Sequence, residues 1–269
     1  MNRVAQAFER GKVFIPFVTA GDPSLEVTEE LVKRMAEAGA DIIELGIPFS
    51  DPIAEGPVIQ AADYRALKAG TTTDRIFDMV TRIRKKCSTP LAFMTYINPI
   101  FTYGVEKFMK QCRSTGIDAV IVPDLPFEER VELKPYCGKY GISLISMVAP
   151  TSKERIAKIA AEAEGFIYCV SSLGVTGMRK EINNDAKEII RQVKEIKNIP
   201  CAIGFGISTP AQAAQMAEFS DGVIVGSAIV KIVEQKGTGC IPYVEEYVRN
   251  MKQAVSSKAS NDIGMPGNP

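Results

Sequence analysis

The sequence predicts an α/β fold, a single (β/α)8 barrel of the TIM type, and three observations support this prediction. Short apolar runs rich in Val, Ile and Phe alternate along the chain with amphipathic helical stretches. Eight such runs can be distinguished, and eight strand-helix units close naturally into a parallel barrel. The length of 269 residues suits one barrel around one core, because such barrels routinely contain about 250 residues. An open, doubly wound sheet is the structural alternative.

The eight candidate strands are runs of β-branched and other apolar residues that end near Gly, Pro, Asp or Ser. They begin near Lys12, Asp41, Pro90, Ala119, Ser143, Phe166, Pro200 and Gly222. Several of the helical stretches between them open with Ser, Thr or Asp and close with Gly. One of them runs from Leu25 to Ala38 and is closed by Gly39. Strict alternation of strands and helices implies parallel pairing through right-handed crossovers.

Additions to the basic barrel are predicted at three places. We expect an extra N-terminal helix, and additional loop or helix elements after strand two and after strand eight. The step from Asp41 to Pro90 is much longer than the other steps between strands, and long loops on a compact scaffold usually have a function. We assign residues 1–255 to the barrel and 256–269, which are polar and rich in Gly and Pro, to a disordered tail.

The overall composition excludes several classes of protein. Lys plus Arg and Asp plus Glu both number 32, so the chain lacks the positive charge expected of a nucleic-acid-binding protein. Charged residues interrupt the apolar positions of the N-terminus, whereas a signal peptide or a membrane span would have an unbroken apolar run there. This pattern favours a cytoplasmic protein with no membrane contact. The six cysteines are scattered without a C-x-x-C pair, so we expect reduced, structural thiols.

The chain contains no histidine. This excludes Ser-His-Asp and Cys-His machinery and any His-ligated metal, and the other potential ligands are not clustered, so no metal site is expected. Proton transfer must therefore fall to Asp, Glu, Tyr, Lys or Cys.

Glycine-rich segments follow the last three predicted strands. Gly204, Phe205 and Gly206 follow strand seven, and Gly226 and Ser227 open a short helix after strand eight. Glycines let backbone N–H groups approach an anion, and a helix N-terminus adds its positive dipole end. A third segment, S-S-L-G-V-T-G-M-R-K, follows strand six. Since barrels commonly bind phosphate in the loops after strands seven and eight, we predict a phosphorylated small-molecule substrate. The alternative is that these glycines only make tight turns.

Acidic residues gather at the end of strand two and in the loop after it. Glu44 alternates with Ile43 and Leu45, so its carboxylate points among apolar side chains if that face turns inward. Burial would raise its pKa into the range useful for general acid-base catalysis. A structural salt bridge is the alternative for Glu44. Asp51 and Glu55 lie in the loop, where Asp51 before Pro52 is more simply explained by the turn.

Aromatic residues collect at predicted strand ends. They are Phe17, Tyr96, Tyr168 and Phe205. Each alone is explained by core packing, but beside a phosphate site they indicate a flat, apolar part of the substrate at the barrel mouth.

Five motifs taken together resemble the tryptophan synthase α subunit family: P-F-V-T-A-G-D-P, E-L-G-I-P-F-S-D-P-I-A-E-G-P-V-I-Q, S-L-G-V-T-G, G-F-G-I and G-S-A-I-V-K-I. The resemblance runs from about Val13 to Met251. It implies a lyase of L-tryptophan biosynthesis that cleaves indole-3-glycerol phosphate by retro-aldol chemistry to indole and glyceraldehyde 3-phosphate. It also implies an αββα heterotetramer, in which the cofactor pyridoxal phosphate belongs to the partner β subunit and not to this chain.

The resemblance implies a role for individual residues. Glu44 matches the catalytic glutamate, and the loop from Pro48 to Pro57 matches the one that communicates with the β subunit. Thr176 matches a threonine that orders the aspartate of that loop. The phosphate-binding positions are Gly177, Gly206, Gly226 and Ser227. The residues of the indole pocket are Phe17, Tyr96, Tyr168 and Phe205.

One position departs from the family pattern. Glu55 stands where the family has an aspartate that accepts the indole N–H, so we expect a second catalytic carboxylate with one extra methylene. Misplacement of such a group by about 1 Å costs on the order of a hundredfold in rate. Two alternatives therefore stay open, a stand-alone indole-glycerol-phosphate lyase and a catalytically weak subunit that mainly activates β. A phosphosugar isomerase is more distant, because the apolar rim favours an aromatic substrate.

Overall fold

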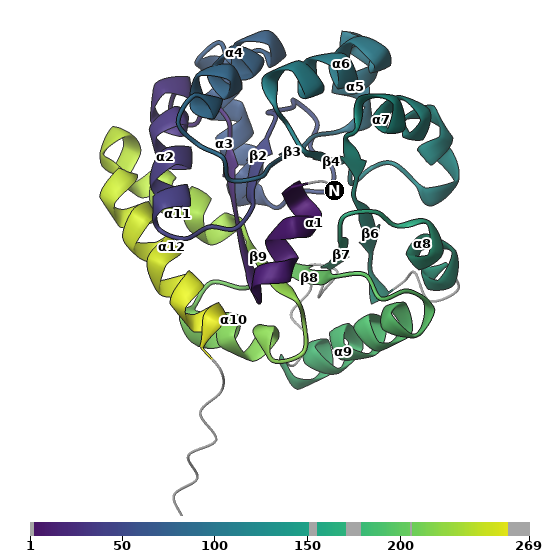
Figure 1. Cartoon of the computed structure of the whole chain (residues 1–269). Coiled ribbons are helices and arrows are strands. Elements are labelled where there is room, and N and C mark those ends of the chain that lie inside the picture. The colour runs from purple at the N-terminus through teal and green to yellow at the C-terminus, as the bar shows by residue number, and fades with distance from the viewer. Residues whose placement is uncertain (1–2, 151–154, 171–178, 205, 258–269) are drawn as a thin grey trace, which may run out of the picture.

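The computed structural model describes residues 3–150, 155–170, 179–204 and 206–257, in which helices surround one parallel sheet rolled into a barrel (Figure 1). The strands are β1 (Val13–Thr19), β2 (Ile43–Gly46), β3 (Leu91–Met94), β4 (Ala119–Ile121), β5 (Ser143–Leu144), β6 (Ser146–Val148), β7 (Ile167–Val170), β8 (Cys201–Gly204) and β9 (Gly222–Val225). Their order is β5-β4-β3-β2-β1-β9-β8-β7-β6, and all of these pairings are parallel. The predicted barrel is confirmed against the open sheet.

The barrel closes at the fifth predicted strand, which is split in two. β5 pairs with β4, β6 pairs with β7, and only Ile145 separates the two pieces. The N–H of Ile145 donates to the carbonyl oxygen of Val120 at 3.0 Å. The buried guanidinium of Arg130 spans the break, because it donates to the Leu144 carbonyl at 2.7 Å and to Ser146 Oγ at 2.6 Å. Nine short strands therefore correspond to the eight predicted ones.

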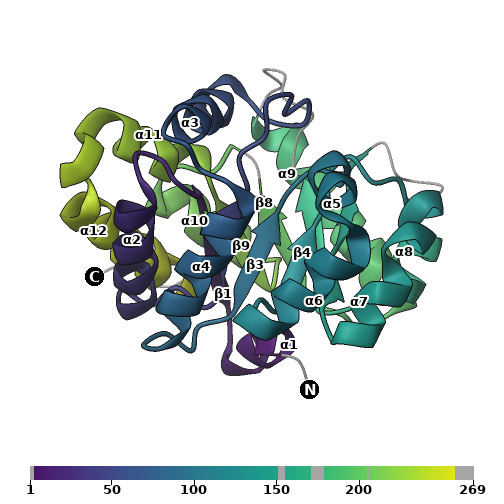
Figure 2. The same ribbon diagram turned by 90° about the horizontal axis from the view of Figure 1, so that it is seen from above.

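Helices surround the wall of the barrel, and the first of them covers one of its ends (Figure 1 and Figure 2). They are α1 (Arg3–Ala7), α2 (Leu25–Glu37), α3 (Pro57–Lys68), α4 (Thr73–Arg84), α5 (Ile97–Tyr103), α6 (Val105–Thr115), α7 (Lys134–Tyr140), α8 (Ile156–Glu162), α9 (Arg179–Ile196), α10 (Pro210–Ala217), α11 (Ser227–Lys236) and α12 (Ile241–Ser256), with 3-10 turns η1 (Phe8–Arg10), η2 (Phe127–Glu132) and η4 (Gly237–Gly239). The three additions are present as α1, as the pair α3 and α4 after β2, and as α12 after α11. Helix α5 was not predicted.

Side-chain alternation along the strands separates two apolar layers. On β2, Ile43 and Leu45 pack against the outer helices, whereas Ile42, just before the strand, belongs to the cluster inside the barrel. Glu44 has the same parity as Ile42 and therefore points inward. The predicted orientation of this carboxylate is confirmed.

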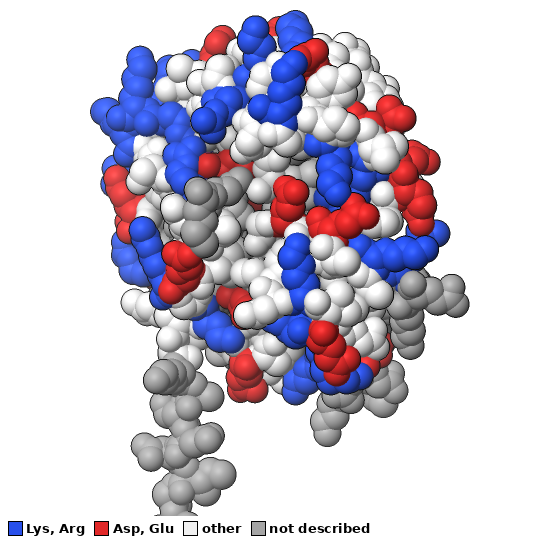
Figure 3. Space-filling view, turned by 45° about the vertical axis from the view of Figure 1, so that its right-hand side comes forward, with Lys and Arg blue, Asp and Glu red and all other residues white. Residues whose placement is uncertain are grey.

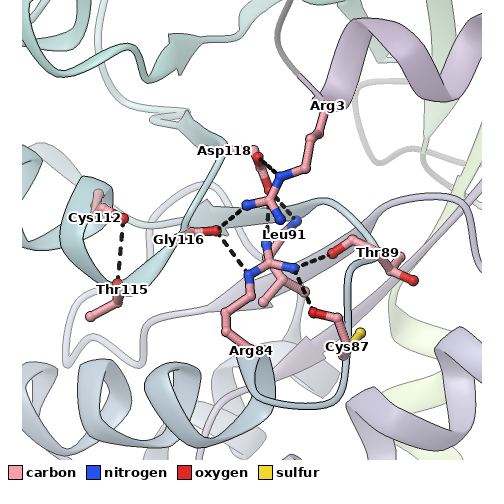
Figure 4. A network of polar contacts seen from close by, with 9 residues as sticks. All are labelled: Arg3, Arg84, Cys87, Thr89, Leu91, Cys112, Thr115, Gly116 and Asp118. Atoms are coloured by element: carbon pink, nitrogen blue, oxygen red, sulfur yellow. Dashed lines mark hydrogen bonds and ion pairs between the residues drawn. The ribbon is translucent and has the colours of Figure 1, made fainter.

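The end of the barrel below the strands is sealed by α1 and η1, which lie at the lower end in Figure 2. The rings of Phe8 and Phe166 lie 5.5 Å apart between their centroids. Beside them, Asp118 accepts from Arg3 Nε at 2.7 Å and from Arg84 Nη2 at 2.8 Å (Figure 4). Both guanidinium groups also donate to the carbonyl of Gly116. An opening to the barrel interior therefore lies at the other end, where the strands finish.

The distribution of surface charge and the state of the cysteines agree with what the composition predicts. Acidic side chains lie among basic ones over the face shown in Figure 3. All six cysteines are free and buried, as expected of structural thiols. Within the described residues, no helix has the length and apolar character to cross a membrane. Residues 258–269 lie outside the described ranges, so the tail remains a prediction.

Candidate active site

A cavity of about 670 Å³ opens at the ends of the strands where the loops gather. Its walls include residues of β1, β2, β3, β6, β7 and β9, of the loops after β2 and β8, and of the starts of α3 and α11. Apolar side chains such as Ile59, Met94, Met147 and Ile224 make up much of the lining. Two carboxylates, those of Glu44 and Glu55, face the same space.

Glu44 is the most deeply buried acid of the cavity. Its side chain is fully enclosed, and among the described residues nothing donates a hydrogen bond to either carboxylate oxygen. Loss of hydration, together with a smaller effect of the nearby charge of Glu55, raises the pKa of Glu44 to about 8. The structural salt bridge considered as an alternative is therefore absent from the described part of the chain. At neutral pH the group is mainly protonated and is poised to give up a proton.

Glu55 lies in the loop after β2 and is half-buried. Its backbone is held locally, because its N–H donates to Pro52 at 3.1 Å and its carbonyl accepts from Gln60 Nε2 at 2.8 Å. Burial raises the pKa of the Glu55 carboxyl to about 7. Two carboxylates with different pKa values thus share one cavity, an arrangement that suits acid and base roles. Asp51 is exposed and accepts from the Ser50 hydroxyl at 2.5 Å, as expected of a turn residue.

Two of the predicted aromatic residues line the cavity, and strand glycines make room for both. A Cβ at Gly46 would lie 2.6 Å from Cζ of Phe17, and one at Gly204 would lie 2.3 Å from the Tyr168 hydroxyl. Gly204 was interpreted as part of the phosphate loop, but it does not line the cavity and instead leaves space for Tyr168. Burial, with the charge of Glu44, raises the pKa of Tyr168 far above its usual range, so the phenol stays neutral.

Tyr96 is buried but is not among the residues that line the cavity. Its hydroxyl instead accepts a hydrogen bond from the N–H of Ala54 at 2.9 Å, and its ring packs against Phe49 at 5.3 Å. The structure thus places Tyr96 beneath the loop that carries Glu55.

A further part of the cavity lining has the features of an anion site. Gly206, Gly226 and Ser227 all line it, and the backbone of Gly206 adopts a left-handed φ of 73°. Helix α11 begins at Ser227 after Gly226, and no described side chain caps its first N–H groups. These groups and the positive end of the helix dipole are left for a ligand. Thr176, Gly177 and Phe205 lie outside the described residues.

Two residues near the site were not singled out from the sequence. Lys231 is the only cationic side chain among the described residues that line the cavity, and it stands four positions after Ser227 on α11. Asp63 is a buried carboxylate on α3. Helical spacing could have indicated both, because residues four apart share one face of a helix. Lys231 stands four positions after Ser227, and Asp63 stands four positions after Ile59.

The fold and the cavity together define a (β/α)8-barrel enzyme that presents carboxylates to an apolar substrate site. Comparison with known proteins shows to which family of barrel enzymes the chain belongs. The family model described as tryptophan synthase alpha chain matches residues 4–256. The tryptophan synthase alpha chain of Lacticaseibacillus casei is 47% identical over 258 residues, with 96% of this chain and 97% of that one covered. That of Halalkalibacterium halodurans is 52% identical over 235 residues, covering 87% and 89%.

Solved structures give the same result. The crystal structure of tryptophan synthase subunit alpha from Legionella pneumophila matches with a TM-score of 0.87 and 38% identity, covering 95% of this chain and 98% of that one. The chain belongs to the tryptophan synthase alpha chain family. It is a lyase that cleaves indole-3-glycerol phosphate, which is the alpha reaction of tryptophan synthase in tryptophan biosynthesis. None of the comparisons favours the alternative functions.

Proposed function

We propose that Glu44 and Glu55 carry out this cleavage as the two catalytic residues. The observation that carries the proposal is that both carboxylates line one apolar cavity and that burial brings the pKa of each close to neutrality. A group whose pKa lies near the working pH is most effective in proton transfer. In a chain without histidine, these two side chains are the acids and bases best placed for the work.

Glu44 is assigned the proton transfers at the reacting bond. In its protonated form it donates a proton to indole C3, and the resulting carboxylate accepts the proton of the glycerol hydroxyl as the C3–C1′ bond breaks. Indole leaves, the hydroxyl carbon becomes the aldehyde of glyceraldehyde 3-phosphate, and the proton of Glu44 is restored. The lack of any described hydrogen-bond partner supports this assignment, because nothing competes for the carboxyl group.

Glu55 is assigned to the indole N–H. As an ionised carboxylate it accepts that hydrogen bond and stabilises the positive charge that develops on the ring when C3 is protonated. Its position on the loop after β2, across an apolar cavity, supports this role. Phe17 and Tyr168 then contact the indole ring.

The phosphate is assigned to the wall opposite the indole. Gly206, Gly226 and Ser227 supply N–H groups there, together with the N-terminus of α11, and we keep Thr176, Gly177 and Phe205 as proposed contacts from the remaining loops. Lys231 adds a positive charge to the same wall. This division of the cavity holds the substrate with its scissile bond near Glu44.

The pH dependence of kcat/KM tests the two assignments. The reaction needs Glu44 protonated and Glu55 ionised, so a bell-shaped profile is expected with limbs near pH 7 and pH 8. The Glu55→Gln variant should lose the acidic limb, and an unaltered profile would contradict its role. The matched control is Glu218→Gln, an exposed acid that follows α10.

We further propose that the chain assembles with a β subunit into an αββα heterotetramer. One matched structure is described as tryptophan synthase from Mycobacterium tuberculosis, not as its alpha chain alone. Exposed apolar side chains on the segments after three neighbouring strands support such an assembly: Ile53 is 83% exposed, Phe101 47% and Val131 68%.

The chain would hold no cofactor of its own, with pyridoxal phosphate in the β subunit. The free thiols fit the proposed cytoplasmic location.

Copurification and indole production test the assembly. We expect the purified chain to form indole from indole-3-glycerol phosphate, to bind a β subunit, and to work faster in its presence. Ile53→Asp and Phe101→Asp should weaken binding at least tenfold, whereas Tyr243→Asp on α12, also an exposed aromatic residue, should not. Full activity without any binding would favour a stand-alone lyase, and activation of β with no indole production would favour a purely activating subunit.

A further inference from the structure

Helix α5 begins directly after Tyr96, and the residue at its N-terminus does not cap it. Tyr96 precedes the first turn with an extended backbone (φ −85°, ψ 161°), and its side chain makes no capping hydrogen bond. The first N–H groups of a helix have no partner within the helix itself. A group from elsewhere in the chain is therefore needed to fix the start of α5, and with it the position of Tyr96.

That group is the carboxylate of Asp124, in the loop after β4. The N–H of Ile97, the first residue of α5, donates to both carboxylate oxygens of Asp124, at 3.0 Å and 3.3 Å. A negative charge at this place also interacts favourably with the positive end of the helix dipole. Among the described residues, the ion pairs of Lys and Arg all involve acids other than Asp124. Its contact with Ile97 is thus a cap supplied by another loop.

Asp124 is itself held in place by a tight turn. The N–H of Leu125 donates to the carbonyl of Val122 at 3.2 Å, which closes the chain around Asp124. Next to this turn, the N–H of Thr95 donates to the carbonyl of Ile121 at 3.0 Å and extends the pairing of β3 with β4. The carboxylate is therefore presented to α5 from a fixed position.

Tyr96 connects the start of α5 to the loop after β2. Its side chain is only 3% exposed, its ring packs against Phe49, and its hydroxyl accepts from the N–H of Ala54 at 2.9 Å. Close-packed groups transmit small displacements to their neighbours. A shift of the backbone at Ile97 is therefore passed through the Tyr96 ring to Ala54, the residue before Glu55.

We propose that Asp124 is a positioning residue, which acts through Tyr96 on the loop that carries Glu55. This inference rests on the proposed function of Glu55. Asp124 is not among the described residues that line the cavity, although its neighbour Pro123 is, so its effect has to pass through other side chains. Since misplacement of a catalytic group by about 1 Å costs on the order of a hundredfold in rate, even a partial loosening of the loop should be measurable.

The test compares Asp124→Ala, which removes the acceptor, with Asp124→Asn, which keeps one. The control is Asp74→Ala, because Asp74 is an exposed acid that accepts from the hydroxyl of Tyr103 at the other end of α5. For Asp124→Ala we expect kcat/KM to fall about five- to tenfold, mainly in kcat, as for the loss of one hydrogen bond. For Asp124→Asn and Asp74→Ala it should stay within about threefold of wild type. Asp124 is only partly buried, so its variants should fold, which thermal unfolding checks.

Combination with Tyr96→Phe distinguishes action through Tyr96 from a general loss of stability. If Asp124 acts through Tyr96, the variant that carries both Asp124→Ala and Tyr96→Phe should lie within about twofold of the slower single variant, whereas independent effects would multiply. Hydrogen exchange gives a second readout that does not depend on activity. The amide of Ala54 should exchange at least about fivefold faster in Asp124→Ala and in Tyr96→Phe, and at the wild-type rate in Asp74→Ala.

Losses that multiply in the double variant would overturn the inference, as would an Asp124→Asn variant as slow as Asp124→Ala. An Asp124→Ala variant that is less stable but has wild-type exchange at Ala54 would overturn it too, since that describes a structural residue only. Glu55→Gln separates these failures from failure of the proposed function. If Glu55→Gln keeps wild-type kcat/KM, the proposed function falls and this inference falls with it, whatever the exchange at Ala54. An impaired Glu55→Gln beside an Asp124→Ala variant that matches Asp74→Ala overturns the role of Asp124 alone.

Discussion

The hydroxyl of Tyr96 accepts a hydrogen bond from the backbone N–H of Ala54 at 2.9 Å, one residue before Glu55. A side chain beyond the end of β3 thereby fixes the loop that follows β2. The contact is partly buried beneath the loop, and the exposed residue Ile53 directly precedes Ala54. Movement of the surface part of the loop is thus linked to the position of Glu55, the proposed second catalytic carboxylate.

Tyr96→Phe should lower kcat/KM by about five- to tenfold. The substitution keeps the ring that packs on Phe49 and removes one hydrogen bond, which is worth about 1 kcal/mol. Steady-state kinetics on indole-3-glycerol phosphate measures the loss. Tyr140→Phe is the control, because its hydroxyl binds Glu106 on the surface. Equal rates for the two variants would show that the Tyr96 contact does not hold Glu55 in place.

Glu44→Gln should reduce kcat by about a thousandfold, since an amide cannot transfer a proton and general acid-base catalysis contributes about 10² to 10⁴. Binding of glyceraldehyde 3-phosphate should change little, because the phosphate is proposed to bind at Gly206, Gly226, Ser227 and the start of α11 and not at Glu44. Single-turnover assays and calorimetric titration separate these two effects. Retention of more than a tenth of the wild-type kcat would exclude Glu44 as the proton donor.

The same substitution should change stability in a pH-dependent way. The pKa of Glu44 is raised in the folded state, so the native protein binds the proton more tightly than the unfolded chain does. The contribution of Glu44 to the stability of the wild type is therefore complete below pH 4.5 and is lost as the pH rises through about 8. Glu44→Gln avoids this loss, and its advantage in unfolding free energy should grow with pH to at most about 5 kcal/mol. Urea unfolding at pH 5 and pH 9 measures the difference, and an equal gain at both would contradict the burial of a titrating carboxyl group.

Much of the fold could be predicted because it depends on local pattern. The positions of the strands and the inward direction of Glu44 follow from alternation with Ile43 and Leu45, which needs no knowledge of the neighbours. The break at Ile145 could not be predicted, because it depends on pairing with two different strands. The space that Gly204 leaves for Tyr168 could not be predicted for the same kind of reason, since the ring that it accommodates belongs to β7.

In the candidate site, too, some residues could be located from the sequence and others could not. Glu55 and the start of α11 were located by motif, whereas the place of Tyr96 depends on a contact with a backbone N–H from another loop. The burial of Asp63 was within reach of helical spacing, because Ile59 and Ala66 mark the inner face of α3.

Glu55→Asp should raise the rate of the alpha reaction if the shorter side chain restores the geometry that the family uses. The gain should lie between a few-fold and about a hundredfold, which is the range expected for correcting a displacement of about 1 Å. Multiple-turnover indole production with and without a β subunit measures it. Glu128→Asp, on the exposed turn η2, is the matched control. An unchanged or lower rate would show that the loop and Gln60 have adapted to the longer side chain.

Lys231→Gln should raise KM for indole-3-glycerol phosphate about fivefold and leave kcat nearly unchanged. Lys231 lies one helical turn after Ser227, and long helical side chains point back toward the helix N-terminus, where the phosphate is proposed to bind. The charge is exposed and screened by salt, which limits its contribution to about 1 kcal/mol. Binding of glycerol phosphate should weaken by the same factor, whereas binding of indole should not change.

Lys236→Gln, near the end of the same helix, is the control, because its ammonium lies over the ring of Tyr243 and not beside the cavity. Raising the ionic strength should remove the difference between wild type and Lys231→Gln, since screening acts on the wild-type charge alone. An equal loss of indole binding would instead mean that the substitution has altered the shape of the cavity. If Lys231→Gln has the same KM as Lys236→Gln, Lys231 does not contribute to phosphate binding. The phosphate would then be bound only by the backbone N–H groups of Gly206, Gly226 and Ser227 and by the dipole of α11.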